Sequence, residues 1–242
     1  MREYSWLERP VSWSHFRIFE AVLDRLDLST AWQSQLHQGT APLSDRVMGR
    51  ISKDAADWIS KFSVGASETI FSEWSRSEIG GRTPEEALLE FGRAVRVVEI
   101  EAARVVSRSN GVEAISKRQG GKSRSKYWGS ESIHKTEGAP FSLDSCALAL
   151  HQSALGWLDW PSQGLPLAER DIPGRYDWVL LECPHRDPLI QEPAIADFLC
   201  SQHIAWFQGL SHAIDSRLSV IERSREADRR YCRLSLVWGT AS

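Results

Sequence analysis

The sequence places a thiol, an imidazole and a carboxylate within five residues, at Cys183, His185 and Asp187. The apolar run 178–181, followed by Glu182, predicts a strand that ends at Cys183, because Pro184 cannot continue a strand ladder. A strand end fixes the backbone while leaving a side chain open to solvent. Since a thiolate is a strong nucleophile once a neighbouring base takes its proton, we expect Cys183 to be a nucleophile and His185 a candidate base. A half-buried cysteine that only ends a strand is the alternative.

A second thiol and imidazole occur three residues apart, at Cys200 and His203. The surrounding residues 194–210 have apolar spacing that predicts a helix, and residues three apart lie on one face of a helix. The pair could therefore supply a thiol with its general base, with His203 as the alternative to His185. It could also bind a metal, and a pair of packed core residues explains the spacing equally well.

Further along the chain, Glu222 ends a predicted strand and Cys232 opens the next one. A hairpin would bring these two residues close together, and Cys183, Cys200 and His203 could converge on the same place. Thiolate, imidazole and carboxylate groups are typical zinc ligands, so a zinc site of Cys200, Glu222 and Cys232 is one alternative. The chain lacks close Cys-x-x-Cys pairs, and our main expectation is a site without a cofactor.

Eleven tryptophans are many for a chain of 242 residues. Most should pack in the core, because large aromatic rings bury much apolar area. Trp157, Trp178 and Trp206 are near the candidate residues, and we expect them to line a small-molecule pocket. Arg225 could hold the carboxylate of a ligand through a bidentate pair.

The N-terminal half has the apolar spacing of amphipathic helices. Residues 14–26 form one such stripe. Ser29 and Thr30 are residue types that often begin helices, so a second short helix is predicted from there to about Gly39. We therefore expect a helical region over residues 1–106.

The clearest helix in this half begins at a capping box. Thr83 is the N-cap, Pro84 takes the first helical position, and Glu86 follows three residues after the cap. The predicted buried face of this helix comprises Leu88, Phe91, Val95, Val98, Ala102 and Val105.

Residues 107–139 change in composition. They are rich in Ser, Gly, Lys and Arg and have almost no apolar periodicity, which predicts a flexible loop or linker. The stretch 117–126 carries the only local group of basic residues. A solvated linker explains that group better than a phosphate contact does, and a lid over a pocket is a third interpretation.

The region 140–242 carries strand patterns at 178–183, 217–222 and 232–237, with the helix 194–210 between them. The last two patterns alternate polar and apolar residues, as half-buried strands of a hairpin do. Together with the helical half, they predict an α+β fold in which the helices pack on a small antiparallel sheet crossed by a helix.

Composition narrows the classes of function. The net charge of −3 gives no basic field for nucleic acid. No apolar run approaches the roughly 20 residues that span a bilayer. Without the pattern of a secretory signal we expect a cytoplasmic protein with reduced cysteines, and the sequence is compatible with a homodimer. Motifs of nucleotide-binding loops, serine hydrolases and zinc proteases are missing.

With these residues in view, the C-terminal segment resembles the bacterial L-2-amino-thiazoline-4-carboxylic acid hydrolase-like family. The resemblance lies in a strand ending in Cys183-Pro184, a helix carrying Cys200 and a hairpin closing with Cys232. The tail is also similar to the vinyl-reductase domain, with Cys200, the strand 220–222 and Cys232 in the corresponding places.

The first resemblance implies a cysteine-dependent hydrolase or ring-opening enzyme, acting on a small heterocyclic or amide-like carboxylate in specialised metabolism. Cys183 would be its nucleophile, His185 or His203 its base, and Cys200 and Cys232 would line the site. The second resemblance implies a small-molecule-binding sensor or carrier domain with a structural zinc. A scaffold subunit with buried cysteines is a third hypothesis.

Overall fold

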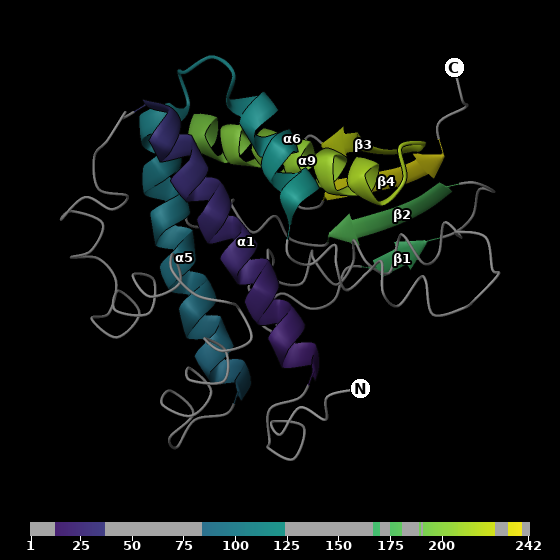
Figure 1. The fold of residues 1–242 in the computed structure, drawn as a ribbon, viewed down its shortest axis with the longest axis horizontal. Coiled ribbons are helices and arrows are strands. Elements are labelled where there is room, and N and C mark those ends of the chain that lie inside the picture. Colours follow the sequence, from purple (N-terminus) through teal and green to yellow (C-terminus); the bar gives the residue numbers. More distant parts are fainter. Residues whose placement is uncertain are drawn as a thin grey trace.

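A computed structural model describes residues 13–36, 84–123, 167–169, 175–180, 189, 191–225 and 232–238. These residues form an α+β fold, as expected (Figure 1). Its helices and strands are α1 (Trp13–Leu36), α5 (Pro84–Val106), α6 (Val112–Lys122), β1 (Leu167–Glu169), β2 (Arg175–Leu180), α9 (Pro193–Ile214), β3 (Leu218–Arg225) and β4 (Cys232–Trp238).

Helix α1 is longer than its sequence predicts, because it does not break at Ser29 and Thr30. Both hydroxyls donate hydrogen bonds back to the carbonyl oxygen four residues earlier: Ser29 to Arg25 at 2.9 Å and Thr30 to Leu26 at 2.9 Å. Such bonds satisfy the hydroxyl within the helix, so these residues do not have to act as caps. The two helices predicted from the sequence are therefore one.

Helix α5 begins at Pro84, as the capping box predicts, while Thr83 lies outside the described residues. It runs parallel to α1. The rings of Phe19 and Phe91 stack between the two helices, with their centroids 5.6 Å apart. The predicted buried face is confirmed up to Ala102. Its last residue is wrong: Val105 is 56% exposed and Val106 is buried instead, because a buried stripe on a helix of 3.6 residues per turn continues with either three- or four-residue steps.

Helix α6 contradicts the prediction of a loop over 107–139 in the part from 112 to 122. Its buried face consists of Val112, Ile115, Ser116 and Gly120. Only two of these are apolar side chains, so hydrophobic periodicity gives almost no signal. The remaining residues of the predicted loop, 124–139, lie outside the description.

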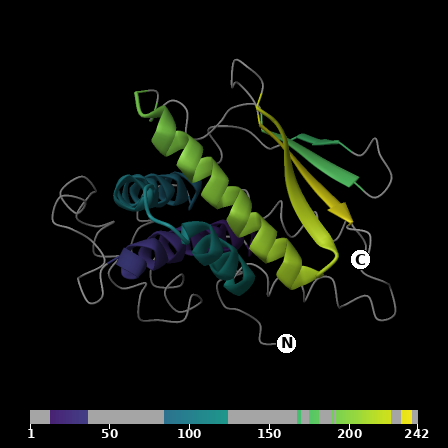
Figure 2. The same cartoon turned by 90° about the horizontal axis from the view of Figure 1, so that it is seen from above.

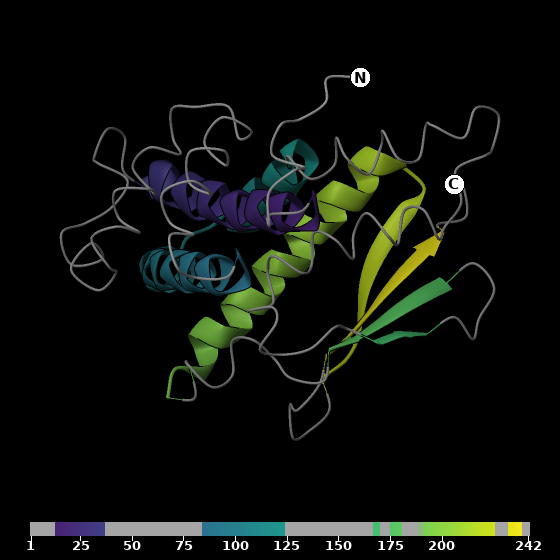
Figure 3. The ribbon, with the colours of Figure 1, turned by 90° about the horizontal axis from the view of Figure 1, so that it is seen from below.

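The four strands form one antiparallel sheet with strand order β1-β2-β4-β3. Helix α9 packs between the sheet and the helices α1, α5 and α6, as Figures 2 and 3 show from opposite sides. The core is continuous across α9: it includes Leu199, Trp206 and Leu210 of the helix and Val220 and Leu236 of the sheet. This arrangement confirms the expected helix crossing the sheet. Within the described ranges, no helix is long and apolar enough to span a membrane.

Candidate active site

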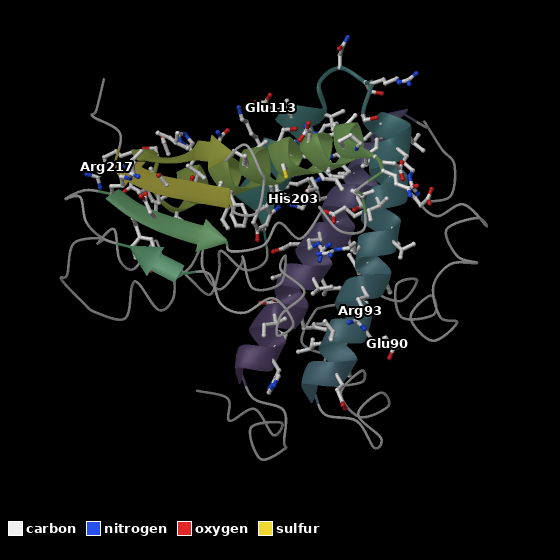
Figure 4. All side chains as sticks on the ribbon, turned by 180° about the vertical axis from the view of Figure 1, so that it is seen from behind. Glu90, Arg93, Glu113, His203 and Arg217 are labelled. Carbon is white, nitrogen blue, oxygen red and sulfur yellow. The ribbon has the colours of Figure 1, made fainter. Side chains whose placement is uncertain are left out.

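A buried charged group joins three helices where α9 crosses α1 and α5. The carboxylate of Glu99 on α5 accepts a hydrogen bond from Nη2 of Arg25 on α1 at 2.8 Å. Its other oxygen lies 2.7 Å from Nε2 of His203 on α9. Figure 4 labels His203. The side chains of Arg25, Glu99 and His203 are 1%, 0% and 10% exposed. We call these three residues the Arg25–Glu99–His203 chain.

Each member is buried because its apolar neighbours in the same helix are buried. Glu99 follows Val98, which is 1% exposed and belongs to the buried face of α5. His203 lies between Leu199 and Trp206, which are four residues before it and three residues after it and are completely buried. Packing of the apolar stripes thus forces the polar groups into the interior.

Two of these three helices carry more buried charged residues, which are Glu20 and Asp24 on α1 and Arg96 on α5. Asp24 accepts a hydrogen bond from the hydroxyl of Ser123, which follows the end of α6. Burying a charge is costly unless it is paired and hydrogen-bonded. The interface between these helices therefore depends on its ion pairs as well as on its apolar contacts.

Burial lowers the pKa of His203 below its ordinary value, although the neighbouring carboxylate of Glu99 acts in the opposite direction. The positive charges of Arg25 and Arg96 lower it further. The imidazole is consequently neutral at pH 7 and can accept a proton. A neutral imidazole held by a carboxylate on a rigid helix is a suitable general base.

The lowered pKa of His203 predicts a pH dependence of stability. Below about pH 6.5 the unfolded chain takes up a proton on this histidine that the folded chain resists, so the free energy of unfolding falls as the pH falls. The loss should reach at most about 1.4 kcal/mol per pH unit and end below the folded pKa. Urea unfolding of the wild type and His203→Asn between pH 8 and pH 5 measures it, and the difference between the two should shrink at low pH.

His212 offers a matched control, because it lies on the same helix with an exposed side chain. His212→Asn should change the free energy of unfolding by no more than about 0.5 kcal/mol at pH 8. If His203→Asn followed the wild-type pH dependence, the neutral buried imidazole would be the wrong description of this site.

Cys200 lies on α9, three residues before His203, and is partly buried. Helical side chains point toward the N-terminus of their helix, so the ring of His203 lies over the turn that carries Cys200. The other candidate nucleophile and base, Cys183 and His185, lie outside the described residues, as does Trp157.

The predicted pocket residues fall into two groups. Trp206 is completely buried in the core and packs edge-to-face on Phe207, with ring centroids 5.1 Å apart. Trp178, Arg225 and Cys232 are described by their backbone alone. In the sheet, Trp178 pairs with Leu234, and Cys232 pairs with Leu180 and with Arg225.

The zinc alternative requires Cys200, Glu222 and Cys232 to meet. In the sheet, Cys232 pairs with Arg225, while Glu222 pairs with Leu234 across a bulge. Helix α9 and strand β3 meet where one follows the other and diverge from there toward the ends that carry these residues (Figures 2 and 3). Among the described residues, no group of three His, Cys, Asp or Glu side chains could hold a metal ion.

Sequence reasoning missed Arg25 and Glu99. The available signal was a charged residue among the apolar positions of an otherwise regular helical stripe, where a solvated residue does not fit. No protein-family model, curated protein or solved structure matches this chain significantly.

Proposed function

We propose that this protein is a cysteine-dependent hydrolase of a small molecule, with His203 as its general base. The Arg25–Glu99–His203 chain is the observation that carries the proposal. An imidazole whose second nitrogen is held by a buried carboxylate is the usual way in which enzymes orient a base beside a nucleophile.

The proposed nucleophile is a cysteine thiol. Cys200 lies one helical turn from His203, and Cys183 is the nucleophile that the sequence favours. In the first step the sulfur bonds to the carbon of a C=N or C=O group, the π electrons move to the nitrogen or oxygen, and His203 takes the thiol proton. His203 then gives this proton to the leaving nitrogen as the C–N bond breaks and the π bond re-forms, which leaves an S-acyl or S-imidoyl enzyme. In the last step water attacks the same carbon with His203 as base, the C–S bond breaks, and the thiolate takes the proton from His203.

The substrate class is proposed from the resemblance of the C-terminal segment to the L-2-amino-thiazoline-4-carboxylic acid hydrolase-like family. It is a small heterocyclic or amide-like carboxylate, as found in bacterial specialised metabolism. The buried base agrees with such chemistry, because a site closed to bulk water limits competing proton transfer. Trp206 is completely buried in the core, so it does not line an open pocket in the hydrolase or in the alternative, a binding module.

The test is turnover of a panel of small cyclic amidines, lactams and amides that carry a carboxylate, with products measured by mass spectrometry. We expect hydrolysis of at least one compound, and His203→Asn should slow it by about 10²–10⁴-fold, the usual contribution of a general base. Either Cys183→Ala or Cys200→Ala should abolish it, which identifies the nucleophile.

His212→Asn serves as the control on the same helix and should retain wild-type turnover. Hydrolysis that survives both cysteine substitutions, or that His203→Asn leaves unchanged, would contradict the assignment. Peptide-level alkylation with iodoacetamide provides an independent reading, because the nucleophilic thiol should react faster in the wild type than in His203→Asn.

A further inference from the structure

Glu99 uses its two carboxylate oxygens for two different helices. One accepts the hydrogen bond of Arg25 and the other lies against His203. Glu99 and Arg25 are almost completely closed to solvent. The protonation of the imidazole is therefore governed by these neighbours and not by bulk water.

We propose that Arg25 is a positioning residue that fixes the proton of His203 on Nε2 and leaves Nδ1 as the proton acceptor. A guanidinium is always protonated and only donates hydrogen bonds, so it holds Glu99 as a carboxylate. A carboxylate only accepts, so the imidazole nitrogen at 2.7 Å must carry the hydrogen. A neutral imidazole has one such hydrogen, which leaves the lone pair on Nδ1.

Removal of Arg25 should reverse this assignment. Loss of the guanidinium that lies 2.8 Å from the carboxylate of Glu99 makes this buried group take up a proton more readily. The protonated carboxyl group of Glu99 would then donate to Nε2, and the hydrogen of the ring would move to Nδ1. His203 would remain in place, but its acceptor nitrogen would be committed to Glu99. This inference rests on the proposed function only for the role that it gives to Nδ1.

The wild-type protein provides the first measurement. Long-range nitrogen–proton correlation NMR on a sample with ¹⁵N-labelled histidines distinguishes the two tautomers, and the His203 signals are those that His203→Asn removes. At pH 7.5 we expect at least about a ten-fold excess of the Nε2–H form, from a charge-assisted hydrogen bond. A predominance of the Nδ1–H form, or of the doubly protonated ring, would overturn the proposal without any variant.

Two substitutions of Arg25 separate charge from packing. Arg25→Met removes the charge, and we expect the tautomer ratio to fall at least about ten-fold. Arg25→Lys keeps a positive charge and should retain the Nε2–H form. This variant still tests the proposal if Arg25→Met does not fold. Arg93→Met is the matched control, because Arg93 is exposed on α5 (Figure 4). A wild-type ratio in folded Arg25→Met, or loss of the Nε2–H form in Arg25→Lys, refutes the role of this charge.

These measurements need no substrate, so they are independent of the proposed function. If the tautomers are as expected but no compound is hydrolysed, the positioning role of Arg25 stands and the proposed hydrolase activity is refuted. If hydrolysis depends on His203 but not on Arg25, and the tautomer ratio is unchanged in Arg25→Met, the hydrolase activity stands and the positioning role of Arg25 is refuted.

Discussion

Replacing Glu99 by alanine is expected to lower the free energy of unfolding by about 3–5 kcal/mol, the usual cost of leaving a buried ion-pair partner alone. The substitution removes the acceptor of Arg25, whose side chain is 1% exposed, and of the His203 ring. Both side chains are largely closed to solvent, so water does not replace the hydrogen bonds that they make with Glu99. Equilibrium urea unfolding at pH 7.5 measures the change.

Two further variants show that the effect comes from the buried charge. Glu90→Ala removes an exposed carboxylate from the same helix and should change stability by no more than about 0.5 kcal/mol (Figure 4). The double variant Arg25→Met/Glu99→Leu should be more stable than Glu99→Ala, because neither charge of the pair remains in the interior. An equal loss in Glu90→Ala and Glu99→Ala would contradict a stabilising role for the ion pair.

Much of the fold could be predicted from the sequence because its helices and strands carry the usual periodic signals. The capping box at Pro84 and the apolar stripe of α5 mark a helix correctly, and the alternation of apolar residues marks β3 and β4. The strand expected at 178–183 overlaps β2, which begins three residues earlier at Arg175, while residues 181–183 lie outside the described residues. The pattern therefore identifies the strand better than its start.

The site could be predicted only in part, because a charged residue within an apolar stripe indicates burial but does not indicate its partner. His203 was identified by its type and its spacing from Cys200. Its partners, Arg25 and Glu99, are 74 residues apart in the chain, and only the packing of α1 on α5 brings them together. A single sequence contains no local pattern that reports such a contact.

Helix α6 was not predicted for a different reason, which is that glycine makes its main contact. The pair Gly120-Gly121 interrupts helices in most sequences and therefore predicts a loop. Here a Cβ on Gly120 would lie 1.9 Å from the carbonyl oxygen of Trp206, and one on Gly209 would lie 1.8 Å from that of Lys117. The backbones of α6 and α9 thus touch each other, and only glycine allows this approach.

This contact leads to the second large expected effect. Gly120→Ala and Gly209→Ala should each destabilise the protein by about 3 kcal/mol or more, since the added methyl meets the backbone and not a movable side chain. The helices would have to separate, and the core between Ile115 and Trp206 would lose packing. Equilibrium urea unfolding again gives the magnitude, and circular dichroism shows whether the helices remain.

Gly121 provides the matched control because it neighbours Gly120 in the same helix. Its added Cβ would lie 3.7 Å from the carbonyl oxygen of Gly209, an ordinary contact, so Gly121→Ala should be neutral or stabilise the protein by up to about 1 kcal/mol. The double variant Gly120→Ala/Gly209→Ala should cost less than the sum of its single changes, because either methyl already separates the two helices. Equal effects at Gly120 and Gly121 would mean that α6 does not pack against the backbone of α9, and full additivity would mean that the two glycines act at separate contacts.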